Sequence, residues 1–138
     1  MDAFVDSVVL IGAFYRSDQW HIQAAPIISE IDSGSDRAII TDFILAEVLN
    51  FLHQKAGHAA AIETLRALEA AENITIVRVT DDQFSAGKAC FERYPRLSLV
   101  DALTVACMKD MDISRIYSFD SDFDGIEGIF RLTQPMGD

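Results

Sequence analysis

Apolar and polar positions along this chain follow two periodic patterns. Short apolar or alternating stretches, which are typical of strands, lie at residues 3–5, 38–40, 74–79, 115–119 and 129–132. Apolar residues at helical spacing predict helices at residues 7–15, 18–31, 42–55, 58–71, 82–94 and 98–111. Because helices alternate with strands, we expect an α/β fold built on a mainly parallel sheet.

Polar residues and prolines mark the expected ends of these helices. Pro26 lies within the second helical stretch, so that helix either begins late or is kinked, and Pro95 ends the fifth helix. The segment Ser33-Gly34-Ser35-Asp36 predicts a turn before the second strand. The expected helix caps are all Ser, Thr or Asp: Asp18, Thr41 or Asp42, Asp81 or Asp82, and Ser98.

Composition and charge mainly exclude classes of protein, such as membrane-spanning proteins and proteins that bind nucleic acid through a basic surface. The 138 residues, half of them hydrophobic and 24% charged, fit one globular domain over residues 1–138. No apolar run approaches a membrane span, so we expect a soluble, cytoplasmic protein whose Cys90 and Cys107 are reduced. The net charge of −11 opposes a sequence-independent grip on nucleic acid through a basic surface. Any nucleic-acid chemistry must therefore be local.

Four carboxylates interrupt otherwise apolar segments and are the strongest chemical signal. Asp6 and Asp120 follow predicted strands, Asp101 lies in the first turn of a helix, and Glu47 lies within the helix after the second strand. Ligands of open parallel sheets collect beyond the carboxyl ends of the strands, so all four acids can face one crevice. Such acids suit Mg²⁺ or Mn²⁺, which can lower the pKa of a water molecule for attack on a phosphodiester.

Each acid also has a structural alternative. Asp6 is placed to cap the helix that follows it, and Ser98-x-x-Asp101 matches a capping box. Glu47 lies on one polar stripe with Asn50 and Gln54 along its helix. Such a stripe is also typical of a solvated helix face. Asp120 is compatible with a simple turn before the last strand. The sequence leaves these alternatives open.

Four short segments occur in a fixed order along nearly the whole chain: Phe4-Val5-Asp6-Ser7, Ala46-Glu47-Val48, Leu97-Ser98-Leu99-Val100-Asp101-Ala102-Leu103, and Ser118-Phe119-Asp120 before Phe123. They resemble the PIN-domain ribonucleases, and most of all the VapC-type toxins of toxin–antitoxin pairs. The resemblance implies a PIN-like three-layer α/β/α fold with a central, mainly parallel sheet.

The resemblance also implies a function. It makes Asp6, Glu47, Asp101 and Asp120 the metal-binding, catalytic acids of an Mg²⁺- or Mn²⁺-dependent endoribonuclease, with Ser118 hydrogen-bonding in the pocket and Asp122 in a doubtful supporting role. The substrate would be RNA. The protein would be the toxin of a type II pair, usually a homodimer, inhibited by a small antitoxin that lays a segment across the site.

Two other functions compete with this one. Asp120-x-Asp122-x-Asp124-Gly125 copies the first half of a calcium loop, which would make this a calcium-binding or structural protein, but Arg131 stands where the loop needs a bidentate glutamate. The second is a catalytically inactive PIN-like binding module. Arg96 and the nearby Arg93 are candidates for holding flanking phosphates, although solvated surface arginines are common.

Overall fold

The computed structural model describes residues 1–34 and 36–136 and contains one sheet of five strands. The strands lie in the order β3-β2-β1-β4-β5, and every neighbouring pair is parallel. The predicted parallel α/β sheet is confirmed. The strands are β1 (Ala3–Val5), β2 (Ala38–Thr41), β3 (Ile74–Val77), β4 (Arg115–Tyr117) and β5 (Phe130–Leu132).

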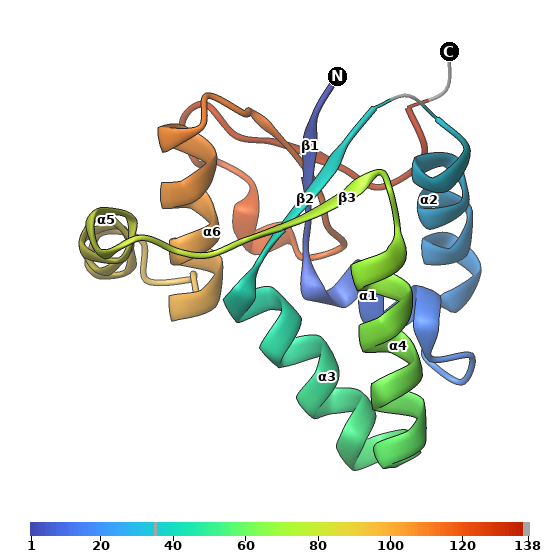
Figure 1. Cartoon of the computed structure of the whole chain (residues 1–138). Coiled ribbons are helices and arrows are strands. Elements are labelled where there is room, and N and C mark those ends of the chain that lie inside the picture. The colour runs from blue at the N-terminus through green and yellow to red at the C-terminus, as the bar shows by residue number, and fades with distance from the viewer. Residues whose placement is uncertain (35, 137–138) are drawn as a thin grey trace.

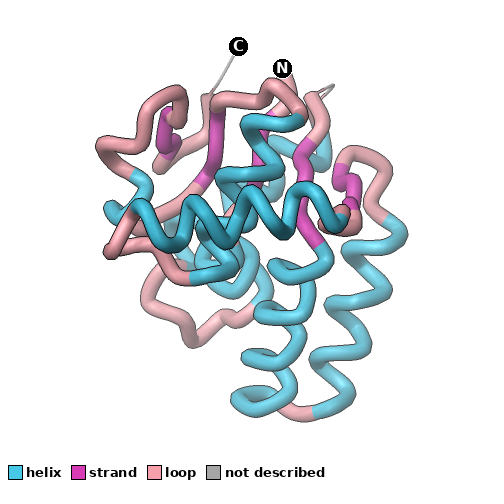
Figure 2. Tube along the Cα trace, turned by 90° about the vertical axis from the view of Figure 1, so that its left-hand side faces the viewer, coloured by secondary structure: helices cyan, strands magenta, loops and turns pink. Residues whose placement is uncertain are grey.

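Helices cover both faces of the sheet, which gives the three layers that the resemblance implied (Figure 1). Helices α5 and α6 pack together over one face, whereas α1 to α4 cover the other, and the α3–α4 hairpin extends beyond the sheet (Figures 1 and 2). The helices are α1 (Ser7–Phe14), α2 (His21–Ser33), α3 (Asp42–Ala56), α4 (His58–Ala70), α5 (Asp81–Arg93) and α6 (Leu99–Asp110).

Strand β1 shows how a short apolar segment builds both halves of the core. Ala3 and Val5 belong to the hydrophobic cluster under α1 to α4, whereas Phe4 belongs to the cluster under α6. All three residues are buried, as expected for a central strand whose side chains alternate between two covered faces. The residue that follows β1 is therefore attached, at the carboxyl ends of the strands, to a strand that packing holds on both faces.

Two predicted strands are too long at their carboxyl ends. Strand β3 ends at Val77, not at residue 79, because its partner β2 ends where Thr41 pairs with Val77. Strand β4 ends at Tyr117, not at residue 119, because Tyr117 pairs with Val5 at the last register position of β1. Both strands end where the neighbouring strand no longer provides a pairing partner. Sequence periodicity does not contain this information.

Two predicted helix caps are wrong. Thr80 caps α5 in place of Asp81 or Asp82, and it forms a reciprocal capping box with Gln83. Asp18 does not cap α2, because the helix begins after Trp20 and the Asp18 carboxylate accepts the Trp20 N–H. Thr41 caps α3 and Ser98 caps α6, as predicted.

Helix α2 begins at His21 and continues through Pro26, so of the two alternatives for this helix, a late start or a kink, a start after the proline is excluded. A proline inside a helix leaves the carbonyl of the residue four positions earlier without its usual donor. Here that residue is Ile22, which is exposed, and Pro26 is exposed as well. Water can therefore solvate the carbonyl. The predicted turn over Ser33–Asp36 contains Ser35, which lies outside the described residues.

Helices α5 and α6 approach each other closely at one glycine. A Cβ built on Gly87 would lie 2.4 Å from Leu103 Cδ2 and 3.1 Å from Leu103 Cα. Gly87 is also the buried residue of α5, so the contact with Leu103 fixes this helix on α6. This packing fixes the relative position of the two helices that residues 94–98, part of the candidate site, connect.

None of the helices in the described residues is long and apolar enough to cross a membrane.

Candidate active site

Asp6 is a buried carboxylate at the carboxyl end of the central strand β1. Its side chain is 3% exposed and accepts two hydrogen bonds, from Ser7 N at 2.8 Å and from Ser118 Oγ at 2.7 Å. Burial raises the pKa of Asp6 to about 6, and these two hydrogen bonds oppose the rise. Asp6 also occupies the cap position of α1, so capping and site formation involve the same side chain.

Ser118 connects two acids that are far apart in the sequence. Its hydroxyl donates to Asp6 Oδ2 and accepts the Asp120 N–H at 3.0 Å. Ser118 directly follows β4, and its side chain is fully buried. Its backbone N–H donates to the Leu132 carbonyl of the neighbouring strand β5. The hydroxyl therefore fixes the position of Asp6 relative to the backbone at Asp120.

Asp120 begins a 3-10 helix, η1 (Ser121–Phe123), and its carboxylate accepts the Asp122 N–H at 2.9 Å. The side chain is half-buried. Phe123, at the end of η1, is buried in the cluster under α6 and holds this turn against the body of the protein. The turn that sequence reasoning offered as an alternative is present, and it also places the Asp120 carboxylate at the strand ends.

Asp101 lies in the first turn of α6 and is half-buried. Ser98 Oγ accepts the Asp101 N–H at 3.2 Å, which is the capping bond expected at this helix start. Burial raises the pKa of Asp101 to about 7, and the charge of Asp6 adds to the rise. The Ser98 hydrogen bond opposes it, whereas the charges of Asp120 and Glu47 raise the pKa further.

Glu47 lies on α3 and is exposed. Asn50 and Gln54, which continue the polar stripe on this helix, are also exposed. The solvated helix face that the sequence left open is therefore real, but Glu47 is the member of the stripe that lines the hollow described next. Helix α3, which carries Glu47, covers the face of the sheet opposite to α6 (Figure 1).

One open hollow of about 270 Å³ brings the four acids together. The residue after β1, the turn after β4 and helices α3 and α6 each contribute one of the four acids, so segments from residue 6 to residue 120 meet here. Ser118 supports the hollow from beneath, through Asp6. The lining residues are Asp6, Ser7, Val8, Glu47, Arg96, Ser98, Asp101, Asp120 and Asp122.

A hard divalent cation fits this set of donors by its chemistry. Carboxylate oxygens are the ligands that Mg²⁺ and Mn²⁺ prefer. Burial, and to a smaller extent mutual repulsion, raises the pKa of Asp6 and Asp101, and a bound cation would favour the charged form of both. As the side chains stand, however, residues 1–34 and 36–136 contain no group of three or more His, Cys, Asp or Glu close enough to hold a metal. Binding would therefore require side-chain movement toward a common centre.

Asp122 and Arg96 form an ion pair at the mouth of the hollow, which sequence reasoning did not foresee. Arg96 Nη2 lies 2.8 Å from Asp122 Oδ1. Arg93, which the sequence had grouped with Arg96, points elsewhere: its guanidinium lies 5.1 Å from the Tyr94 ring centroid and lines a separate hollow between α5 and α6. The two arginines differ in surroundings because α5 ends between them.

The acidic turn does not have the form of a calcium loop. Asp124 is held by Arg131, with Nε to Oδ1 at 2.8 Å and Nη2 to Oδ2 at 3.0 Å, and Arg131 also donates to the Ser118 carbonyl at 3.3 Å. The Arg131 guanidinium holds the pKa of Asp124 below its usual value. Both oxygens of Asp124 are engaged, and strands flank the turn in place of paired helices.

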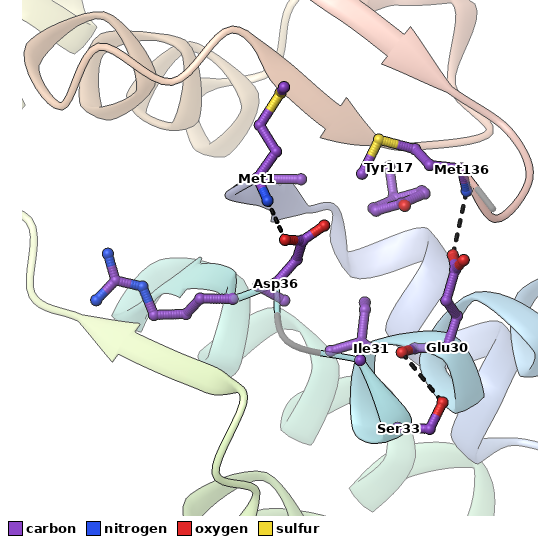
Figure 3. A pocket seen from close by; sticks show the side chains of 11 residues that line it. Met1, Glu30, Ile31, Ser33, Asp36, Tyr117 and Met136 are labelled. Carbon is purple, nitrogen blue, oxygen red and sulfur yellow. Dashed lines mark hydrogen bonds and ion pairs between the residues drawn. The ribbon is translucent and has the colours of Figure 1, made fainter. Parts of the chain in front are cut away.

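A second hollow, of about 320 Å³, lies at the opposite end of the sheet, where β1 and β2 begin (Figure 3). Met1 and Met136 both line it: the Met1 amino group pairs with Asp36, and the Glu30 carboxylate accepts the Met136 N–H (Figure 3). Tyr117 closes it from the sheet side. None of the four acids lines it, so it is separate from the candidate active site.

Comparison with known proteins gives a consistent result. The PIN domain family model matches residues 3–129. VapC ribonuclease Mb1869c of Mycobacterium bovis is 33% identical over 136 residues, covering 93% of this chain and 97% of that protein. Ribonuclease VapC13 of Mycobacterium tuberculosis is similar to the same extent.

Solved structures show the same fold. Mycobacterium tuberculosis VapC20, described as a Sarcin-Ricin loop cleaving toxin, superposes with a TM-score of 0.79 at 24% identity, covering 91% of this chain and 95% of that one. A chain of VapBC2 from Rickettsia felis, bound to a DNA fragment from its promoter, gives a TM-score of 0.73 at 9% identity, with 96% and 98% covered. At such identities the similarity shows the fold alone.

Proposed function

Because the chain belongs to the PIN-domain family and is similar over nearly its whole length to VapC ribonucleases, we propose that it is an endoribonuclease. We propose further that it requires Mg²⁺ or Mn²⁺, and that Asp6, Glu47, Asp101 and Asp120 hold the metal. The observation that carries the proposal is their convergence on one hollow at the carboxyl ends of the strands.

The residues of the site have distinct tasks in hydrolysis of an RNA phosphodiester. The Ser7 N–H and the Ser118 hydroxyl fix the Asp6 carboxylate, so its position does not depend on a mobile side chain. When bound, a divalent cation would supply positive charge at the scissile phosphate and lower the pKa of the attacking water. Asp101 and Glu47 face the hollow from opposite layers and complete its acidic lining.

The partners are part of the proposal. Solved structures of the same fold include a toxin–antitoxin complex from Klebsiella pneumoniae and VapBC2. We propose that this chain is the toxin of a type II pair in the cytoplasm, that it forms a homodimer, and that a small antitoxin inhibits it. An acidic hollow accepts guanidinium, so the antitoxin should present Arg or Lys near Asp6 and Asp101.

Cleavage assays with purified protein test the activity. We expect the chain, freed of any partner, to cleave single-stranded RNA with Mg²⁺ or Mn²⁺ and to stop when a chelator is added. A DNA strand of the same sequence should not be cleaved. Asp6→Asn and Asp120→Asn should remove most of the activity. Asp124→Asn, which changes an acid of the same turn that does not line the hollow, is the matched control.

A catalytically inactive binding module makes the opposite prediction. Such a protein would bind RNA or a partner without cleavage, and Asp6→Asn would leave that binding unchanged. Expression together with the adjacent reading frame tests the partner, because a small protein that copurifies and suppresses cleavage is expected. Light scattering of the purified chain tests the homodimer. Parental cleavage rates in both Asp6→Asn and Asp120→Asn would show that the assigned site is wrong.

A further inference from the structure

We propose that Arg96 binds a phosphate group of the RNA backbone beside the scissile bond, and that Asp122 holds the guanidinium in position before RNA arrives. The inference rests on the proposed function and deepens it, because it assigns roles to an arginine and a carboxylate outside the four-acid set. It follows from the charge of the hollow, from the geometry of the ion pair and from the anchoring of both residues.

The charge of the hollow makes a cationic group necessary for substrate binding. Among the described residues that line it, five are carboxylates and Arg96 is the only cationic side chain. The whole chain carries a net charge of −11. A polyanion such as RNA is therefore repelled unless positive charge is supplied locally. A metal would supply it at the centre of the hollow, and Arg96 supplies it at the mouth.

The ion pair leaves most of the guanidinium available. Arg96 Nε donates to Asp122 Oδ1 at 3.0 Å, and Arg96 Nη2 lies 2.8 Å from the same oxygen. A guanidinium has five N–H donors, and the Arg96 side chain makes no hydrogen bond to any other described residue. A phosphate oxygen can therefore bind beside Asp122 or replace it. The Arg96 side chain is 65% exposed and Asp122 is 34% exposed, so water competes for the pair and exchange is easy.

Both partners project from fixed backbone. Leu97, next to Arg96, is buried, and its N–H donates to the Tyr94 carbonyl at 3.1 Å. Ser98 follows directly as the cap of α6. On the other side, the Asp122 N–H donates to the Asp120 carboxylate. Thus Arg96 is held at the mouth of the hollow by the same turn that positions one of the four acids, and little ordering is needed when a phosphate binds.

Two other arginines differ from Arg96. Arg131 has a structural role, and Arg93 lies away from the hollow that the four acids line. Arg131 is only 20% exposed and uses Nε, Nη1 and Nη2 in hydrogen bonds to Asp124 and the Ser118 carbonyl. Arg93 is exposed but lines the hollow between α5 and α6. Of these three arginines, Arg96 alone combines a place at the acidic hollow with N–H donors that bond to no other described residue, which is why the phosphate is assigned to it.

A binding assay that does not depend on cleavage tests the inference. A short fluorescein-labelled RNA is titrated with protein in the Asp6→Asn background, with Mg²⁺ present, over a series of salt concentrations. We expect Arg96→Gln to weaken binding on the order of tenfold, since a charge-assisted hydrogen bond to phosphate is lost. The slope of log affinity against log salt should become less steep by about 0.7, the value for one phosphate contact in single-stranded nucleic acid.

Two further variants separate phosphate binding from a structural role. In Asp122→Asn the amide oxygen can still accept the Arg96 Nε–H, so the guanidinium stays in position, whereas the charge that competes with phosphate is removed. RNA should therefore bind a few-fold more tightly to this variant, whereas a purely structural ion pair would make both variants equally weak. Arg93→Gln is the matched control, and its affinity and salt slope should equal those of the parent. In the cleaving protein, Arg96→Gln should raise KM more than it lowers kcat, because the phosphate contact is made before the transition state.

The outcomes distinguish this inference from the proposed function. If the parent cleaves RNA but Arg96→Gln keeps its affinity and salt slope, the phosphate assignment is overturned and the function stands. Equal losses of affinity in Arg96→Gln and Asp122→Asn would also overturn it, in favour of a structural pair. If the parent cleaves no RNA with either metal, the proposed function fails. In that case, weaker RNA binding by Arg96→Gln than by the parent would still support the phosphate contact.

Discussion

Replacing Asp6 by asparagine should stabilise the metal-free protein, although it removes a residue assigned to the active site. Asp6 is 3% exposed, and burial raises its pKa from 3.8 to about 6. At about pH 8 the carboxylate is charged in both the folded and the unfolded state. The free energy needed to keep it ionised is higher in the folded state, because the group is buried there. A pKa difference of about 2 corresponds to roughly 3 kcal/mol of lost folding free energy, at 1.36 kcal/mol per pH unit.

Asparagine recovers only part of that free energy. Its Oδ1 can still accept the Ser7 N–H, whereas its Nδ2 cannot accept the hydroxyl proton of Ser118. Disturbing that hydrogen bond costs about 1–2 kcal/mol. The expected net effect of Asp6→Asn is therefore a gain of about 1–2 kcal/mol in the free energy of unfolding near pH 8, in the presence of chelator.

The gain depends on pH in a defined direction. Because the folded-state pKa of Asp6 is raised, the folded parent binds more protons than the unfolded chain between about pH 4 and pH 6, and its stability increases as pH falls through this range. Asp101, with a pKa of about 7, extends the range upward. The advantage of Asp6→Asn should be constant above about pH 7, disappear near about pH 5 and be reversed at about pH 4, where the parent has regained most of the roughly 3 kcal/mol.

Urea unfolding of parent and variant at several pH values, with chelator, measures this difference. Mg²⁺ at ten times its dissociation constant should stabilise the parent by about 1.4 kcal/mol, because only the folded state binds it, and should stabilise Asp6→Asn much less. The reasoning is refuted if Asp6→Asn is the less stable protein at pH 8 without metal, or if the difference between the two proteins is the same at pH 4 and pH 8.

Three further substitutions give expected outcomes in the same unfolding and metal-binding assays. Ser118→Ala should destabilise by about 1–3 kcal/mol, because it leaves buried polar groups unpaired, and should raise the pKa of Asp6 further, as NMR titration would show. Gly87→Val should destabilise by about 1–3 kcal/mol, since its side chain would overlap Leu103; a stability equal to the parent would contradict the close packing. Glu47→Gln should change stability by less than about 0.5 kcal/mol because Glu47 is exposed, yet weaken Mg²⁺ binding; calcium binding that survives it would favour the acidic turn as the metal site.

The order of elements and most of their positions could be predicted from the sequence. Alternation of strands and helices requires crossover connections, and these make a parallel sheet the expected arrangement. Ser98 was identified correctly as a cap, and Thr41 was one of the two candidates for its helix, because a cap acts through backbone within one turn of its own position. Where the prediction failed, as at Thr80, two neighbouring residue types were both acceptable caps and only the helix geometry selected one.

Candidate acids could also be chosen from the sequence, because a carboxylate inside an apolar segment is costly wherever that segment folds. Their individual states could not. Asp6 is buried and Glu47 is exposed, although both interrupt apolar runs. The difference arises because Asp6 ends a central strand covered on both faces, whereas Glu47 lies on the outer part of a helix.

Contacts between distant segments were decided by the tertiary structure alone. Ser118 and Asp6 are separated by 112 positions and meet because β4 pairs with β1 in a register that ends both strands together. The same distinction holds for Arg93 and Arg96, which are near neighbours in sequence but reach different hollows because a helix ends between them. Local patterns determine helices, strands and caps, since those depend on neighbours in the chain. Hydrogen bonds and ion pairs across the sheet depend on strand order and register, which no local pattern contains.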